Sequence, residues 1–238
     1  MLKRIIDISI SIMIIVLFSP LIALILLYVF LITGDNPVFL QERKISLDKK
    51  GFKLIKIRTI RNSKQFFELE SKSHKIFIKE GYEKFIPPFC RWLRKSGFDE
   101  ILQIFNVLKG EMSIVGPRPL LITDLLIMQK SENDLYQKRT RINSKPGITG
   151  YWQILGERAK GAENMVELDE KYENEKSLLF DLKIIGRTFL IFATASHSDS
   201  IICNTKKSST LNIEQIKYTY YKILGNKILS ILPESYRN

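Results

Sequence analysis

The sequence contains few of the residues that build disulfide frameworks and soft-metal sites. Its two cysteines, Cys90 and Cys203, lie far apart and form no C-x-x-C pair, which excludes a disulfide framework and a zinc ribbon. Only two histidines are present, His74 and His197, so a histidine-rich metal site is excluded as well. Any metal bound by this chain should therefore be a hard cation held by oxygen ligands.

Acidic residues are scarce relative to basic ones. The 238 residues include 37 lysines and arginines but only 25 aspartates and glutamates, which gives a formal net charge of +12. Such an excess predicts anionic partners: phosphates, anionic lipid headgroups or nucleic acid. Hydrophobic residues make up 45% of the chain and charged residues 26%, which excludes wholesale disorder, and the length allows one domain of ordinary size or two small ones.

Charge is absent altogether from residues 8–32. As a continuous helix, this segment would be roughly 37 Å long, against about 30 Å for the hydrocarbon core of a bilayer. The segment is therefore predicted to lie in lipid. A secretory signal is disfavoured, because the apolar run exceeds the usual length of about 7–15 residues and no small-residue cleavage site follows it.

Two features indicate how this segment meets the bilayer. Basic residues flank both ends, with Lys3 and Arg4 before it and nine lysines and arginines within residues 41–64, and positive charge marks the cytoplasmic side. Pro20 lacks an amide hydrogen and interrupts the helical ladder halfway along, where the hydroxyl of Ser19 can satisfy the freed carbonyl. Composition alone leaves a re-entrant helix and a kinked single-pass anchor equally open.

The basic block that follows has a membrane interpretation and a structural one. Residues 41–64 carry nine basic and two acidic side chains, a net charge of +7. Such a run is usually a solvated face, but beside a membrane each basic side chain is attracted to anionic headgroups by about 1 kcal/mol. Within the block, apolar and basic residues alternate over residues 52–57, which predicts a short strand or hairpin.

The remaining chain alternates predicted helices with glycine–proline turns. Helical patterns follow a turn at residues 84–95 and recur at 99–109, 120–136, 169–175 and 178–195. In the helix over 99–109, Leu102, Phe105 and Leu108 form an apolar stripe, and Gly110 is the predicted C-cap. Proline and glycine predict turns at 115–119 and 145–150. Residues 196–210 resemble a linker, and an amphipathic helix from Ile213 to Leu232 could lie on a membrane, on the domain or on another subunit.

Two adjacent carboxylates, Asp99 and Glu100, fall in the first turn of the helix predicted over 99–109. Ser96 and Asp99 fit a capping-box-like pattern, which explains an acidic residue here without catalysis. A helix N-terminus also stabilises an ionised carboxylate, as a nucleophile or a Mg²⁺ ligand requires. Basic side chains that could hold a diphosphate lie directly upstream: Arg91, Arg94 and Lys95. With the two glycine–proline turns, these features favour phosphoryl transfer.

Several blocks, in order along the chain, carry a resemblance to a known family. Residues 94–119 read RKSGFDEILQIFNVLKGEMSIVGPRP, and residues 145–153 read KPGITGYWQ. Shorter matches are Lys3-Arg4-x-x-Asp7, Ser19-Pro20, Gln41-x-Arg43, Lys56-x-Arg58 and Asp181-Leu-Lys-Ile184. Over residues 1–195, the chain resembles the bacterial sugar transferases, monotopic phosphoglycosyl transferases that start glycan assembly on polyprenyl phosphate.

The resemblance implies a fold and a location. The expected fold is α+β and mostly helical, with a re-entrant membrane helix over residues 1–36 that bends at Ser19 and Pro20. A compact cytoplasmic catalytic domain follows over residues 37–195, with a small β element and interfacial amphipathic helices. Residues 196–238 form the linker and C-terminal amphipathic helix. The expected location is the bacterial inner (cytoplasmic) membrane, with the catalytic domain on its cytoplasmic face.

The resemblance also implies a reaction. The aspartate of the family's Asp-Glu dyad, here Asp99, attacks the β-phosphate of a nucleotide sugar, usually a UDP-sugar, and releases UMP. The phosphosugar–aspartyl intermediate is then resolved by polyprenyl (undecaprenyl) phosphate. Glu100 completes the catalytic pair, and Mg²⁺ at Asp99 is the implied cofactor. The substrate-binding residues carried over from the motifs are Arg94, Pro117, Arg118, Pro119 and Gln153.

The sequence departs from the family pattern in two places. Ser-Gly-Phe precedes the dyad where the family usually has Ser/Thr-Ser-Leu, and Ile-Leu-Gln follows where the family has Leu-Pro-Gln. The usual Gln-x-x-Gly-Arg appears here as Gln153-Ile-Leu-Gly156-Glu157-Arg158. The dyad is intact, so these changes bear on donor specificity and rate.

The expected partners are a UDP-sugar donor, the polyprenyl phosphate acceptor and membrane lipid, with no nucleic acid. A homodimer, the identity of the sugar and the glycan pathway are left open. The alternative from a different class is a non-catalytic, membrane-anchored basic protein that binds anionic lipid or nucleic acid. The charge supports this alternative, but the sequence contains no recognisable nucleic-acid-binding motif.

Overall fold

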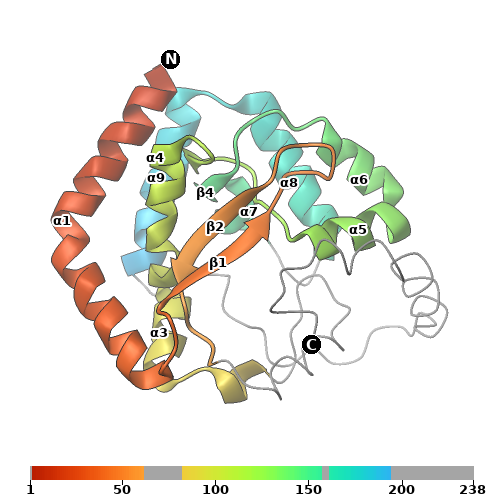
Figure 1. Cartoon of the computed structure of the whole chain (residues 1–238). Helices are drawn as coiled ribbons and strands as arrows, with labels where there is room; N and C mark the ends of the chain where they lie inside the picture. The colour runs from red at the N-terminus through yellow and green to blue at the C-terminus, as the bar shows by residue number, and fades with distance from the viewer. Residues whose placement is uncertain (1, 62–81, 157–160, 194–238) are drawn as a thin grey trace, which may run out of the picture. The chain divides into compact units, whose positions relative to one another are not determined.

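The structure, a computed structural model, describes residues 2–61, 82–156 and 161–193 (Figure 1). The chain forms two compact units, residues 1–202 and 203–238, and every described residue belongs to the first. The linker and amphipathic helix predicted after residue 196 lie outside the described residues.

The apolar N-terminal segment forms one long helix, α1 (Leu2–Thr33). Among the residues described, it alone is long and apolar enough to cross a membrane, with a mean hydropathy of 3.0 in its most apolar stretch. The helix continues through Pro20, and Ser19 Oγ lies 3.5 Å from the Val16 carbonyl that the proline leaves free, which confirms the role predicted for the serine. Figure 1 shows that the axis of α1 changes direction about halfway along.

Both ends of α1 pack on the same folded unit. Near its start, Asp7 accepts hydrogen bonds from Ser113 Oγ (2.8 Å) and from the Ile114 amide (3.1 Å). In its second half, three buried side chains join a hydrophobic cluster that also includes Cys90 and Leu93: Ile22, Ile25 and Val29. A helix with the length to cross a bilayer therefore contacts one unit at both of its ends.

The predicted hairpin is confirmed by β1 (Val38–Arg43) and β2 (Phe52–Ile57), which pair antiparallel. Gln41 lies opposite Leu54, and Phe39 lies opposite Lys56. Because side chains alternate along a strand and directly opposed residues share a face, one face of the hairpin presents Gln41, Arg43, Leu54 and Lys56. The other face presents Ile55 and Ile57 to the cluster that holds the second half of α1.

A second, parallel pair of strands joins the two glycine–proline motifs. β3 (Ser113–Val115) pairs with β4 (Gly147–Thr149), with Ser113 opposite Gly147 and Val115 opposite Thr149. The prediction of an extended, non-helical turn over 115–119 is confirmed. The prediction that 145–150 is only a turn was wrong, because this segment finds backbone partners in β3 more than thirty residues earlier.

The helices confirm some of the predicted boundaries and correct others. The turn and helix predicted over 84–95 are confirmed by η1 (Tyr82–Phe85) and α3 (Pro88–Ser96). The single helix predicted over 120–136 is two, α5 (Ile122–Ser131) and α6 (Asn133–Thr140), because Glu132 leaves the helical region with φ −141° and ψ 55°. The remaining helices are α7 (Tyr151–Leu155), α8 (Gly161–Glu175), which starts eight residues earlier than predicted, and α9 (Leu178–Ala193).

The helix predicted over 99–109 begins differently from expectation. Its first part is a 3₁₀ helix, η2 (Phe98–Gln103), and only α4 (Ile104–Lys109) is α-helical. Gly110, with φ 81°, caps α4 as predicted. The apolar stripe was partly wrong, because Phe105 is 40% exposed, whereas Leu102 is buried as predicted.

Candidate active site

The loop before the two carboxylates consists of a single glycine. Gly97, with φ 77°, ends α3 and is also the residue from which η2 starts. Ser96 is therefore still helical, and its hydroxyl donates to the carbonyls of Trp92 (3.0 Å) and Leu93 (3.1 Å). The predicted capping box was wrong, because η2 has no side-chain cap.

The Asp99 side chain is buried, with 5% of its surface exposed. Burial raises the pKa of Asp99 from its ordinary 3.8 to about 6, against the charges of Lys56 and Arg94, which lower it, while Glu100 raises it further. We expected the helix start to keep this carboxylate ionised, but desolvation outweighs the local backbone hydrogen bond. At neutral pH, the group is still mostly ionised, and it is poorly solvated, which suits a nucleophile.

Two cations from other elements act on Asp99. Lys56 lies on the face of β2 that also carries Leu54. Burial lowers the pKa of Lys56 to about 8, and Arg94 and Arg43 lower it as well, although Asp99 raises it. Arg94, near the end of α3, is held by a hydrogen bond from its Nη1 to Thr59 Oγ1 (2.9 Å). Among the described residues, the buried Nε atoms of Arg43 and Arg94 have no hydrogen-bond partner. Two buried guanidinium donors of the site are thus left for a ligand to satisfy.

A small cleft adjoins the dyad. It brings together predicted site residues from three parts of the chain: Glu100, Arg118, Pro119 and Gln153. Lys56 and Arg43 from the hairpin also line it, as do Leu54, Gln103, Gly147 and Ile148. Asp99, Arg94 and Pro117 are not among the lining residues, although Asp99 and Arg94 act electrostatically on Lys56 of the cleft. The cleft therefore combines three cations with one carboxylate of the dyad.

Glycines allow the two glycine–proline loops to touch backbone to backbone. A Cβ on Gly116 would lie 2.2 Å from the Lys145 carbonyl oxygen, and one on Gly147 would lie 2.1 Å from the Gly116 amide nitrogen. Main-chain hydrogen bonds join the two loops. The Gly116 amide donates to the Thr149 carbonyl (2.9 Å), and the Gly147 amide donates to the Pro117 carbonyl (3.0 Å). This close approach places the Pro-Arg-Pro turn beside Gln153, which is buried at the start of α7.

A buried ion pair holds the main chain of the Pro-Arg-Pro turn. Arg139 of α6 and Asp169 of α8 are fully buried, with Nη1 and Oδ2 2.9 Å apart. Asp169 accepts from the Arg118 amide (3.3 Å), and Arg139 Nη2 donates to the Arg118 carbonyl. The Arg118 guanidinium lies 5.2 Å from the centre of the Trp152 ring, in a cation–π contact. Both the backbone and the side chain of Arg118 are thereby oriented.

The first turns of α1 anchor the strand that leads into this turn. Besides the bonds from Asp7 to β3, Lys3 Nζ donates to the Val115 carbonyl (3.1 Å) and pairs with Asp181 of α9 at 2.5 Å. Tyr172 Oη lies between the same two groups, 3.2 Å from the Val115 carbonyl oxygen and 2.8 Å from Asp181, and its single O–H can donate to either. The Lys3-Arg4-x-x-Asp7 and Asp181 motifs are therefore parts of one network that ties the membrane segment to the active site.

Sequence reasoning missed several residues of this site. Lys56 and Arg43 appeared in matched motifs but were not selected, since they are two of the nine basic residues within residues 41–64. Strand alternation was the signal that could have separated them, because both fall on the face that carries Gln41 and Leu54. Arg139 and Asp169 carried no signal, since each is an ordinary charge on its own helix until α6 packs against α8.

Asp99 and Glu100 can be compared with the ligands that a magnesium ion needs. Within the described residues, no group of three or more histidine, cysteine, aspartate or glutamate side chains could hold a metal ion. Asp99 and Glu100 supply two neighbouring carboxylates. Mg²⁺ in phosphoryl-transfer sites is commonly held by one or two carboxylates, with water and substrate phosphates completing its shell. The donor set fits a Mg²⁺ that binds together with a diphosphate.

Comparison with known proteins shows the family of this chain. Residues 1–195 match the family described as bacterial sugar transferase. This chain belongs to the bacterial sugar transferase family. The resemblance drawn from the motifs is thus confirmed, and the chain is an enzyme of the phosphoglycosyl transferase class.

The match covers very different shares of the named relatives of this bacterial sugar transferase. The exopolysaccharide production protein ExoY of Sinorhizobium fredii is 32% identical over 194 residues, which cover 78% of this chain and 83% of ExoY. The undecaprenyl-phosphate galactose phosphotransferase of Salmonella typhimurium is 32% identical over 79% of this chain. The UDP-glucose:undecaprenyl-phosphate glucose-1-phosphate transferase of Escherichia coli is 33% identical over 79% of this chain. The match spans only 39% of each of these last two proteins.

Proposed function

We propose that this transferase moves a sugar 1-phosphate from a UDP-sugar to undecaprenyl phosphate, the first membrane step in building a surface polysaccharide. Two relatives are named for undecaprenyl-phosphate sugar transfer, one with galactose and one with UDP-glucose, and a third for exopolysaccharide production. The observation that carries the proposal is the buried Asp99, with its pKa near 6, next to two cations and beside the cleft of the Pro-Arg-Pro turn.

The reaction has two displacement steps at the same phosphorus. In the first, a carboxylate oxygen of Asp99 bonds to the β-phosphorus while the bond to the bridging oxygen breaks, and UMP leaves with that oxygen. In the second, an oxygen of the acceptor phosphate bonds to the same phosphorus and the Asp99–phosphorus bond breaks. The products are undecaprenyl diphosphate sugar and a free Asp99 carboxylate. Glu100, which lines the cleft, positions the acceptor.

The cations that act on Asp99 and those that line the cleft have separate roles. Lys56 and Arg94, which lower the pKa of Asp99, are placed to compensate the charge that develops on the transferred phosphoryl group. Arg118, which is oriented by Trp152 and by the buried Arg139–Asp169 pair, binds a donor phosphate. Gln153 contacts the substrate rather than taking part in the chemistry.

Asp99, with Glu100 beside it, would hold Mg²⁺ together with the diphosphate of the donor. Bound there, the ion would neutralise diphosphate charge.

The membrane arrangement follows from the contacts of α1. Both of its ends pack on one folded unit, and both flanks are basic, so a helix that enters the bilayer and returns agrees with the contacts and with the charge rule. The catalytic unit then lies on the cytoplasmic face. Helix α9 would rest at the interface, since it buries Ile184 and exposes four large apolar side chains: Leu179, Leu182, Phe189 and Leu190.

The decisive experiment is sugar-phosphate transfer by Asp99→Asn. Isolated membranes containing this variant, a Glu100→Gln variant or the parent would be given a panel of UDP-sugars with Mg²⁺ and undecaprenyl phosphate, and UMP release would be measured. We expect Asp99→Asn to abolish release at unchanged expression and membrane insertion, and Glu100→Gln to impair it severely. Substantial turnover by Asp99→Asn would refute the nucleophile, and a parent that is silent with every donor would favour a membrane-anchored binding protein.

Topology is tested separately. Single cysteines at Leu2 and Asn36, in a background in which Cys203 is serine, would be labelled in sealed vesicles with a membrane-impermeant maleimide. A re-entrant helix predicts labelling of both cysteines from the same side of the bilayer. Labelling from opposite sides would show that α1 spans the membrane.

A further inference from the structure

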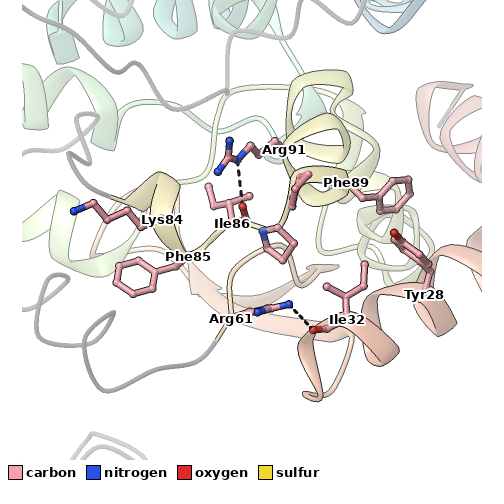
Figure 2. A pocket seen from close by; sticks show the side chains of 10 residues that line it. Tyr28, Ile32, Arg61, Lys84, Phe85, Ile86, Phe89 and Arg91 are labelled. Carbon is pink, nitrogen blue, oxygen red and sulfur yellow. Dashed lines mark hydrogen bonds between the residues drawn. The ribbon is translucent and has the colours of Figure 1, made fainter.

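A cavity of about 460 Å³ lies where the end of α1 meets η1 and the start of α3 (Figure 2). Of the residues that the structure describes, none lines both this cavity and the catalytic cleft. Its apolar lining comes from Tyr28, Ile32, Phe85, Ile86, Pro87, Pro88 and Phe89. The other three lining residues are all basic: Arg61, Lys84 and Arg91. Among the described residues, no acidic side chain lines it.

The cations approach the cavity from different elements. Arg61 Nη2 donates to the Ile32 carbonyl in the last turn of α1 (2.9 Å). Arg91 Nε, from α3, donates to the Ile86 carbonyl (3.2 Å), and Figure 2 shows both of these hydrogen bonds as dashed lines. Lys84 belongs to η1 and is exposed. These three basic side chains therefore give the otherwise apolar cavity a positive electrostatic potential.

Aromatic side chains continue from the cavity along the surface. The ring of Tyr28 contacts Phe89 edge-on at 4.7 Å, Phe89 stacks on Trp92 at 5.7 Å, and Trp92 stacks on Phe98 at 5.8 Å. Tyr28 and Trp92 are each 46% exposed. Partly exposed tyrosine and tryptophan next to a lipid-embedded helix are typical of the headgroup level of a bilayer. The cavity opens at that level.

We propose that this cavity binds the phosphodiester headgroup of an anionic membrane phospholipid as a resident lipid. Lys84 pairs with the phosphate, Arg61 and Arg91 add positive potential, and the prolines and Ile32 contact the glycerol and the first methylenes of the acyl chains. A resident lipid fits better than the acceptor substrate, because the acceptor phosphate must reach the dyad, whose cleft is lined by other residues. The site needs α1 to lie in lipid, but it does not depend on the sugar-transfer chemistry.

Binding is measured on the full-length protein in a neutral detergent. Dihexanoyl phosphatidylglycerol is titrated against dihexanoyl phosphatidylcholine, and bound lipid is followed by native mass spectrometry. The test variant is Lys84→Glu, which reverses an exposed charge without removing a packed group; the matched control is Lys130→Glu, exposed on α5. Asp99→Asn is included so that binding is scored independently of catalysis. Unfolding temperatures verify that the variants remain folded.

We expect the parent, Lys130→Glu and Asp99→Asn to prefer phosphatidylglycerol by about tenfold or more, and Lys84→Glu to lose that preference. Equal binding of the two lipids by the parent, or a preference retained in Lys84→Glu, would overturn the proposal. If inorganic phosphate displaces phosphatidylglycerol at a similar concentration, the cavity binds anions in general and the proposal of a phospholipid site is wrong. Displacement by a short-chain polyprenyl phosphate at its acceptor KM would assign the cavity to the substrate instead.

Discussion

Replacing Lys56 by arginine should change the pH dependence of the first chemical step. Lys56 lines the cleft and has its pKa lowered to about 8, first by burial and then by Arg94 and Arg43. If its positive charge stabilises the phosphoryl group during attack by Asp99, the step must slow as pH rises and Lys56 loses its proton. A guanidinium at the same position stays protonated in this range, so the slowing should disappear in Lys56→Arg.

The magnitude follows from the pKa. With a pKa of about 8, the protonated fraction of Lys56 falls from roughly 90% at pH 7 to roughly 10% at pH 9, so the rate of the step should fall about tenfold. Lys56→Arg should lose less than about twofold over the same range. On the acid side, Asp99 must be ionised, and its pKa of about 6 predicts a rate that rises with pH toward neutrality in both proteins. The parent profile is therefore bell-shaped.

The assay is single-turnover release of UMP from a UDP-sugar without acceptor, in buffers of constant ionic strength from pH 5 to 9.5. Omitting the acceptor matters, because a phosphate monoester itself titrates near pH 6. Circular dichroism at pH 9 verifies that both proteins remain folded. A parent rate that stays level through pH 9, or an alkaline fall of the same size in Lys56→Arg, would refute the role assigned to this lysine.

Variants at three further places test the supporting structure, with Gly186→Ala as a comparison for the first and Asp169→Leu as a second change for the second. Gly116→Ala puts a Cβ 2.2 Å from the Lys145 carbonyl oxygen and should lower UMP release more than about tenfold. Gly186→Ala has open space around its Cβ and should stabilise α9 by up to about 1 kcal/mol in thermal unfolding. Arg139→Met leaves Asp169 buried without its partner and should cost about 3–5 kcal/mol of unfolding free energy; adding Asp169→Leu should restore part of it. Asp7→Asn weakens the bonds to β3 and should cost about 1–3 kcal/mol, with membrane insertion unchanged.

Local features could be predicted well because they depend on neighbouring residues. The β1–β2 hairpin follows from alternation, the turn over 115–119 follows from two prolines, and the end of α4 follows from Gly110. The capping box failed for a geometric reason. Gly97 adopts a left-handed conformation that ends one helix and starts the next, so Gly97 rather than Ser96 takes the N-cap position of η2, and Ser96 Oγ accepts only a long hydrogen bond from the Phe98 amide (3.4 Å).

Long-range pairs could not be predicted from one sequence. The parallel pairing of β3 with β4 joins segments more than thirty residues apart, and nothing in either segment specifies the other. The same holds for Arg139 and Asp169, since 30 residues separate them and their contact depends on how α6 packs on α8. Family motifs compensated in part: they marked Asp99, Arg118 and Gln153 without showing what orients them.

The amino-acid sequence by itself determined that residues 8–32 form an uncharged apolar helix long enough to cross a bilayer, and where the chain must turn, because side-chain polarity and the ring of proline are properties of the residues themselves. The tertiary structure alone decided the protonation of Asp99 and the orientation of Arg118. A pKa is set by desolvation and by charges brought from distant segments, and a side chain is oriented by partners such as Trp152 that only packing supplies.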